Sequence, residues 1–293
     1  SAQSTQKRYP ASQRQFIERT LYNPAFMQEN LALKKVNEVQ TTLPPLVPTS
    51  GKVSTISNAV LLGSAGNVFS CVRGEQNQVV AVDSLNLLAF IHRSNPSTFG
   101  GSSGHLRYDI SIDGGITWSN DNGPLNPLNT NAARYPNISA SNFFGGSNPM
   151  NAEFVYYAAT VNSGANAFNG HVYGVSSIVT TGVPNSTEHY AFQGQNAMLP
   201  GGLSQSARGI YWVSEIGGNG TLSNGDIYIY RGEYQAGLND IVFVRTDTID
   251  DNSSLSFNGD PHLTGSNIAF SPDGEIGWAA WLGDPIGGRD SIY

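Results

Sequence analysis

The sequence predicts an all-β fold of repeated four-stranded antiparallel sheets, preceded by an N-terminal helical arm. Two observations support this prediction. Only 13% of the 293 residues are charged, whereas Gly (33) and Tyr (13) are abundant, a composition typical of many short strands joined by polar turns. Four apolar runs also recur along the chain, beginning at Asn86, Glu153, Gly209 and Ile276, which lie 67, 56 and 67 residues apart.

Residues 1–50 differ in pattern from residues 51–293. Ser12 can cap a first helix, and Asn23 with Pro24 begins a second, so residues 12–39 are predicted to be helical. The proline-rich stretch TTLPPLVP then forms a stiff connector. The arm either packs on its own domain or docks on a partner, and the sequence leaves both readings open.

Charge and apolar content exclude several classes of protein. Residues 1–50 carry a net charge of +3 and the remainder −10, with only one lysine, Lys52, beyond the arm. Nucleic-acid binding needs clustered cations, so this acidic region is a poor partner for nucleic acid. The longest apolar runs are too short for a transmembrane helix. The single Cys71 rules out an internal disulfide and is predicted to be a small core residue.

Each repeat contains four strand-like runs separated by turn sequences. Small antiparallel sheets that recur about every 60 residues are typical of radial repetition around an axis, and the fold predicted for residues 51–293 is therefore a β-propeller with about four blades begun. Pro136 and Pro261 are each expected just before the first strand of a repeat, where a missing N–H is tolerated.

The stretch SIDGGITW, residues 111–118, is the most specific motif in the chain. It is expected between the third and fourth strands of the first repeat. An Asp early in such a turn accepts backbone N–H groups, the glycines supply positive φ, and the Trp packs back on the turn. A second stretch, SPDGEIGW, is degenerate and is interpreted as an ordinary hairpin turn. The first stretch matches the Asp-box pattern Ser-x-Asp-x-Gly-x-Thr-Trp at Ser111, Asp113, Gly115, Thr117 and Trp118.

Through this motif the chain resembles the Asp-box (BNR-repeat) β-propellers of the sialidase superfamily, and more specifically the propellers of large secreted Bacteroidota proteins. The resemblance implies a secreted or cell-surface location and a structural role for the Asp-box. The fourth repeat stops at Tyr293 before its sheet is complete, so we expect the natural polypeptide to continue with further blades. The resemblance implies a C-terminal secretion or anchoring module of the type IX kind. Residues 51–293 would then be the N-terminal part of a larger ring.

The catalytic signatures of sialidases are not found. No Arg-Ile-Pro precedes the first repeat, and the loop SNPSTFGGSSGH, where the family acid would lie, has no carboxylate. Asp109 alternates with Ile110 and Ile112, which predicts an outward, solvated position. These departures favour a non-catalytic module that binds a glycan or a protein. The alternative is a sialidase-like glycosidase or polysaccharide lyase whose catalytic residues lie partly beyond this chain.

Three arginines are the candidate ligand-binding residues. Arg93, Arg134 and Arg208 lie at comparable ends of inner-strand regions, where a guanidinium either grips a carboxylate or sulfate or makes a structural ion pair. The five histidines are scattered without metal-ligand spacing, so no metal site and no cofactor is predicted. Residues 245–260 are either a calcium site or a solvated loop, with oxygen ligands at Asp247, Asp250 and Asp251.

Overall fold

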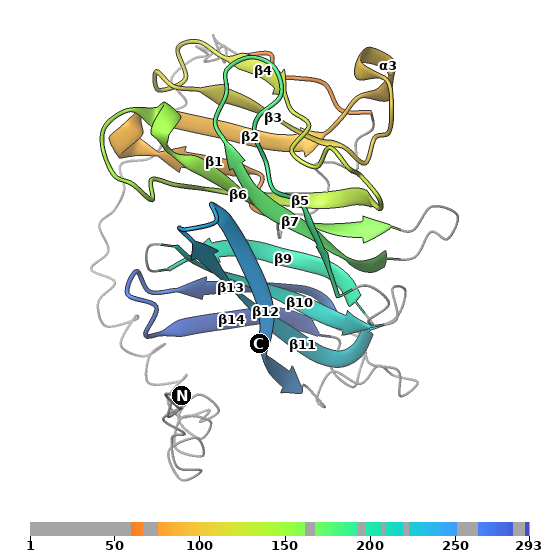
Figure 1. The fold of residues 1–293 in the computed structure, drawn as a ribbon. Helices are drawn as coiled ribbons and strands as arrows, with labels where there is room; N and C mark the ends of the chain where they lie inside the picture. Colours follow the sequence, from red (N-terminus) through yellow and green to blue (C-terminus); the bar gives the residue numbers. More distant parts are fainter. Residues whose placement is uncertain are drawn as a thin grey trace, which may run out of the picture. The chain divides into compact units, whose positions relative to one another are not determined.

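The computed structural model describes residues 60–66, 76–161, 168–192, 197–206, 209–218, 223–250, 263–283 and 291–292. These residues belong to a unit that spans Val60–Tyr293 and is separate from Ser1–Ala59. The predicted helices of residues 12–39 and the predicted core position of Cys71 lie outside the described residues. The described part is mainly β-structure, as the sequence predicts (Figure 1).

Fifteen strands form four antiparallel sheets in the described residues, and each strand pairs with its neighbour in sequence. The first sheet contains β1 (Val79–Val82), β2 (Leu87–Arg93), β3 (Leu106–Ser111) and β4 (Ser119–Asn122). The second contains β5 (Ala132–Ser141), β6 (Glu153–Val161), β7 (Phe168–Ser177) and β8 (His189–Ala191).

The third and fourth sheets continue the same order. The third contains β9 (Ala197–Gln205), β10 (Ile210–Gly218), β11 (Ser223–Gln235) and β12 (Asp240–Asp250). The fourth contains β13 (Leu263–Phe270), β14 (Gly277–Gly283) and β15 (Ser291–Ile292). Helical structure in the described residues is limited to α3 (Pro96–Phe99), η2 (Asp83–Leu85) and η3 (Pro149–Asn151). The predicted four strands per repeat are thus confirmed for the first three sheets.

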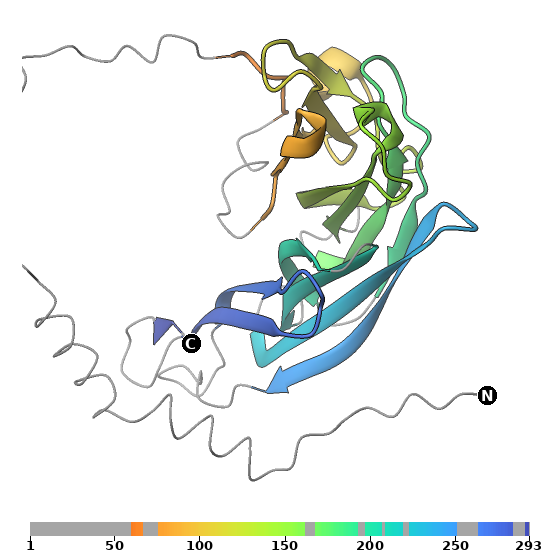
Figure 2. The ribbon, with the colours of Figure 1, turned by 90° about the vertical axis from the view of Figure 1, so that its left-hand side faces the viewer.

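The sheets pack face to face in series (Figure 2). Residues 154–159 of strand β6 form a continuous apolar run. Phe154 and Tyr156 belong to the core between the first and second sheets, whereas Val155 and Tyr157 belong to the core between the second and third. Because successive side chains of a strand point to opposite faces, a strand that lies between two cores needs apolar residues at every position.

Pro136 does not precede its strand, and that part of the prediction is wrong. It lies inside β5, where the pairing register shifts between Arg134 and Asn137 and Tyr135 adopts φ +52°. This irregularity takes Pro136 out of the hydrogen-bonded ladder, so its missing N–H leaves no strand partner unsatisfied. Pro261 lies outside the described residues.

A chain of buried polar side chains joins the second sheet to the third. The Tyr157 hydroxyl lies 2.8 Å from Nδ1 of His171, and Nε2 of His171 lies 2.7 Å from Oε1 of Glu215. All three residues are fully buried. Closer to the surface, a second pair joins the same two sheets, with His189 Nε2 lying 2.7 Å from Asp240 Oδ2.

These two pairs should differ greatly in their effect on stability. Replacing His171 by Leu leaves the Glu215 carboxylate buried without its imidazole partner, which should lower the free energy of unfolding by about 3 kcal/mol or more. Replacing His189 by Leu, in a pair whose side chains are 39% and 17% exposed, should lower it by about 1 kcal/mol or less. Urea unfolding of both variants measures the difference. Equal losses of stability would show that the pair of His171 and Glu215 contributes no more than the pair of His189 and Asp240.

Candidate functional site

The stretch SIDGGITW, residues 111–118, forms the turn between β3 and β4, at the position that the sequence predicts. Oδ1 of Asp113 accepts the backbone N–H groups of Ile116 and Thr117 at 3.0 and 2.9 Å. The Thr117 hydroxyl donates to the other carboxylate oxygen at 2.6 Å. Oγ of Ser111 accepts the N–H of Gly115 at 2.7 Å and donates to Asp113 at the same distance. These bonds close the turn and hold the start of β4 against the end of β3.

The remaining residues of the stretch SIDGGITW complete the same turn. Gly114 and Gly115 adopt φ values of +73° and +92°, which a side chain would strain. The indole of Trp118 folds back, and its Nε1 donates to the Gly115 carbonyl at 3.2 Å. The hydrogen bonds of the turn hold the pKa of Asp113 down at about 2, with the Thr117 hydroxyl as the largest contribution.

The degenerate stretch SPDGEIGW is the hairpin turn between β13 and β14, as the sequence predicts, yet it repeats part of the hydrogen bonding of residues 111–118. The Ser271 hydroxyl donates to Asp273, and Asp273 accepts the N–H of Glu275 at 3.0 Å. The two turns differ in position, because the complete motif links the last two strands of its sheet and the degenerate one links the first two.

Asp109 is fully buried, so its predicted outward position is wrong. The residues that cover it come from a distant part of the chain. The N–H of Gly63 donates to Asp109 Oδ2 at 2.9 Å, and the N–H of Ser64 donates to Asp121 Oδ1 at 3.0 Å. Residues 60–66 therefore lie over the face of the first sheet that the local sequence pattern assigns to solvent.

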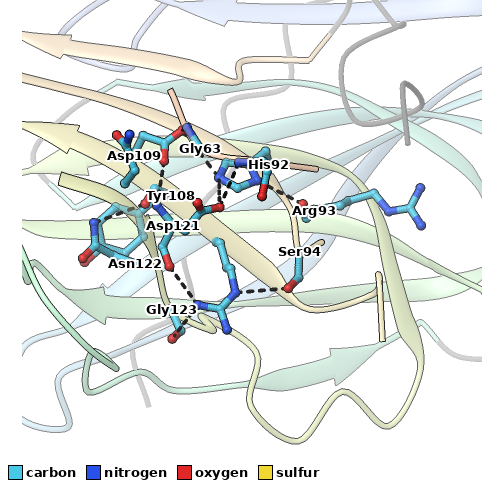
Figure 3. Close-up of polar contacts among 12 residues, drawn as sticks. Gly63, His92, Arg93, Ser94, Tyr108, Asp109, Asp121, Asn122 and Gly123 are labelled. Atoms are coloured by element: carbon cyan, nitrogen blue, oxygen red, sulfur yellow. Dashed lines mark hydrogen bonds and ion pairs between the residues drawn. The ribbon is translucent and has the colours of Figure 1, made fainter. Parts of the chain in front are cut away.

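Beneath this segment three side chains from successive strands come together: His92 on β2, Asp109 on β3 and Asp121 on β4 (Figure 3). Nε2 of His92 lies 3.5 Å from Asp109 Oδ2 and 3.6 Å from Asp121 Oδ1. His92 is only 2% exposed, and the Asp121 side chain is 18% exposed. We refer to His92, Asp109 and Asp121 as the His-Asp-Asp cluster.

Backbone groups orient every member of the His-Asp-Asp cluster. Nδ1 of His92 lies 3.0 Å from the Arg93 carbonyl, and Oδ1 of Asp109 accepts the Asp121 N–H at 2.7 Å. Burial lowers the pKa of His92, but its interactions with Asp109, the Arg93 carbonyl and Asp121 together raise that pKa above its usual value. The cluster thus concentrates negative charge around one imidazole nitrogen.

This cluster was not predicted from the sequence because its members share no local spacing. Residues 92, 109 and 121 become neighbours only through strand register, in which Asp109 lies opposite Phe90 and is therefore diagonal to His92. A signal was present in the sequence, since β2, β3 and β4 each carry a titratable residue, but the covering segment could not be inferred.

Two of the three candidate arginines lie close together. Arg93 ends β2 and is 3% exposed, with Nε and Nη2 donating to the carbonyl and hydroxyl of Ser103 at 2.9 and 2.7 Å. Arg134 on β5 donates to the Ala133 carbonyl at 2.8 Å. Burial and the neighbouring positive charge of Arg134 lower the pKa of Arg93 to about 10. Arg208 lies outside the described residues.

The predicted calcium region begins as strand, not as loop. Strand β12 extends to Asp250, and Asp247 on it accepts the N–H of Thr248 at 2.8 Å. The interpretation of residues 245–250 as a loop is therefore wrong, and Asp251 lies outside the described residues.

The first strand of each sheet contributes to one cavity of about 810 Å³. Strands β1, β5, β9 and β13 all line it, together with part of β14. Apolar side chains such as Ile138 and Leu203 form much of the wall, and neutral polar groups are interspersed. The polar lining residues are Asn77, Ser139, Ser204, Gln205 and Asn267.

The comparisons with known proteins give no family assignment. No protein family matches the sequence, and no curated protein shows significant sequence similarity to it. Across the described ranges, every helix falls short of the length and apolar character that a membrane span requires.

The low pKa of Asp113 gives the stability of the turn at residues 111–118 a definite pH dependence. The folded-state pKa of about 2 lies below the ordinary value of 3.8, so the stabilisation from the ionised carboxylate is complete above pH 3.8 and is lost as pH falls through about 2. Urea unfolding between these pH values should show a steeper loss of stability for the wild type than for Asp113→Asn. Identical pH profiles would contradict the role of the charged carboxylate in closing the turn.

Gly63 should be intolerant of any side chain. A Cβ at this position would lie 2.5 Å from Asp109 Oδ1 and 2.7 Å from Asp121 Cγ, closer than atoms can pack. Gly63→Ala should therefore lower the free energy of unfolding by about 1–3 kcal/mol. The matched control is Gly237→Ala, because a Cβ there meets no atom within 4 Å. Thermal denaturation that shifts equally in both variants would show that residues 60–66 are not fixed over the cluster.

Proposed function

We propose that residues 51–293 form blades of an Asp-box β-propeller that acts as a non-catalytic binding module for a glycan or a protein. The observation that supports this most directly is the cavity lined by the first strand of all four sheets. In a propeller the first strand of each blade lies nearest the axis, so these strands share one central space. The closed turn at residues 111–118 and the order of strands in each sheet agree with the same architecture.

The chemistry of the cavity favours a neutral ligand over a strongly charged one. Its lining combines apolar side chains with amides and hydroxyls, and the described residues that line it include no Asp, Glu, Lys or Arg. Trp278, which is 71% exposed, lies on the wall. An exposed indole beside amide groups is suited to packing against a sugar ring whose hydroxyls form hydrogen bonds, or against an extended peptide.

The alternative is a sialidase-like glycosidase or a polysaccharide lyase whose catalytic residues lie partly outside this chain. Glycosidases use two carboxyl groups, or a Tyr/Glu pair with an acid, that reach the substrate. In the described residues Tyr157 and Glu215 are connected through His171 but are fully buried between two sheets. A buried pair cannot reach a polysaccharide, and this favours the non-catalytic function. The sequence resemblance, rather than any contact, is the basis for proposing a secreted or cell-surface location.

A glycan array followed by calorimetry on the full chain tests the binding function. Trp278→Ala and Gln205→Ala should each weaken the affinity for the ligand found, by about tenfold for a lost stacking or hydrogen-bonding contact. Phe144→Ala is the control, because Phe144 is similarly exposed, at 68%, but does not line the cavity. Unaltered affinity in both cavity variants would contradict the assignment of the site, and release of reducing or unsaturated sugars from the ligand would support the enzymatic alternative.

A further inference from the structure

The His-Asp-Asp cluster has an unsatisfied position at its centre. Nε2 of His92 is buried and has no hydrogen-bond partner among the residues that the structure describes, although two carboxylate oxygens lie 3.5 and 3.6 Å away. These separations exceed the range of N–H···O hydrogen bonds, which is about 2.7–3.2 Å. A proton on Nε2 would therefore form only a weak hydrogen bond to either carboxylate.

The tautomer of His92 also indicates that Nε2 is left without a partner. Its Nδ1 lies 3.0 Å from the Arg93 carbonyl, which can only accept, so Nδ1 carries the proton and donates it. In the neutral ring this leaves the lone pair of Nε2 directed at two carboxylates. A lone pair facing two anions is repulsive unless a cation lies between them. An Nδ1–H that donates to a backbone carbonyl while Nε2 is left free is the usual arrangement of a metal-binding histidine.

The two distances from the imidazole nitrogen to the carboxylate oxygens fit a metal ion with short bonds. Two ligand atoms bound to one tetrahedral Zn²⁺ at about 2.0–2.1 Å lie about 3.3 Å apart, close to the separations of 3.5 and 3.6 Å seen here. All three ligand atoms lie within 4.8 Å of one another. A mixed set of one imidazole and two carboxylates suits Zn²⁺ or Mn²⁺ better than Ca²⁺, which takes six to eight oxygen ligands.

The groups around the cluster also orient its two carboxylates, as the surroundings of a metal site do. The N–H groups of Gly63, Ser64 and Asp121 donate to the two carboxylates and fix their orientation. The guanidinium of Arg107 donates to the backbone carbonyls of Asp121 and Gly123. A divalent cation would balance the two carboxylates with a neutral imidazole, leaving no net buried charge.

From these observations we propose that His92, Asp109 and Asp121 form a binding site for a divalent transition-metal ion, with Zn²⁺ or Mn²⁺ as the ion that fits the donors. The three ligands come from consecutive strands, and residues 60–66 close over them. Binding therefore stabilises the first sheet together with the segment that covers it.

The test uses the full chain, stripped with a chelator and then titrated with Zn²⁺ or Mn²⁺. We expect one equivalent of ion to remain after dialysis, as measured by elemental analysis, and the melting temperature to rise with ion concentration. Asp121→Asn removes a ligand charge at nearly the same size, and Asp121 is the most exposed of the three ligands. This variant should bind the ion at least about a hundredfold more weakly than the wild type. Loss of a residue that only supports a metal ligand already weakens metal binding by about 10–100-fold. Ca²⁺ should give no comparable shift.

His189→Gln is the matched control, because it alters a different His–carboxylate pair, with Asp240, and should leave ion binding unchanged. If Asp121→Asn does not fold, the absorption spectrum of Co²⁺ bound to the wild type still decides the question. A single site with tetrahedral nitrogen and oxygen ligands, together with an altered ¹⁵N shift of the His92 ring, supports the proposal. Failure of the wild type to retain any ion, or retention that Asp121→Asn does not weaken, overturns it and leaves His92 as a protonated cation between two carboxylates.

Discussion

The rest of the described structure depends on the packing of one sheet against the next, with strand β6 buried on both faces. Its even-numbered apolar residues, such as Phe154 and Tyr156, fill one core, and the odd-numbered Val155 and Tyr157 fill the next. A sheet that is apolar on both faces is stable only while both neighbours are present. The polar chain from Tyr157 through His171 to Glu215 lies within the second of these cores. It sets the lateral position of the two sheets, because hydrogen bonds, unlike apolar contacts, tolerate little sliding.

The elements of the fold could be predicted from the sequence because their signals are local. A run such as the one from Glu153 to Val161 indicates a strand without information from the rest of the chain. Glycines such as Gly114 and Gly115 indicate a turn in the same way. Strand order within each sheet follows from chain order, since antiparallel neighbours joined by short turns pair first. Pro136 was misplaced for a related reason, because a β-bulge depends on pairing with the opposite strand and leaves little trace in the sequence.

The candidate site could not be predicted in the same way. Asp109 alternates with apolar neighbours as a solvated residue would, and only the backbone of Gly63, 46 residues earlier, changes its environment. His92 and Asp121 likewise gain their roles from strand register and from distant contacts. The arginines show the opposite case: Arg93 was identified as a ligand-binding candidate from its place at the end of a strand, yet its guanidinium bonds to Ser103. The sequence predicts which strand carries a side chain, but the residues that this side chain contacts depend on the tertiary fold.

The strict sequential order of the strands also bears on how the molecule forms during synthesis. Each sheet is contained in one continuous stretch of chain, so its strands can pair as soon as that stretch has left the ribosome, without waiting for later residues. Asn77 connects the sheets that form in this way. Its N–H donates to the Asn137 side chain and its amide donates to the Leu203 carbonyl, 60 and 126 residues further along the chain. A residue made before the first sheet thus forms both bonds only after Leu203 on β9, the first strand of the third sheet, has emerged, and the growing chain must keep that asparagine accessible until then.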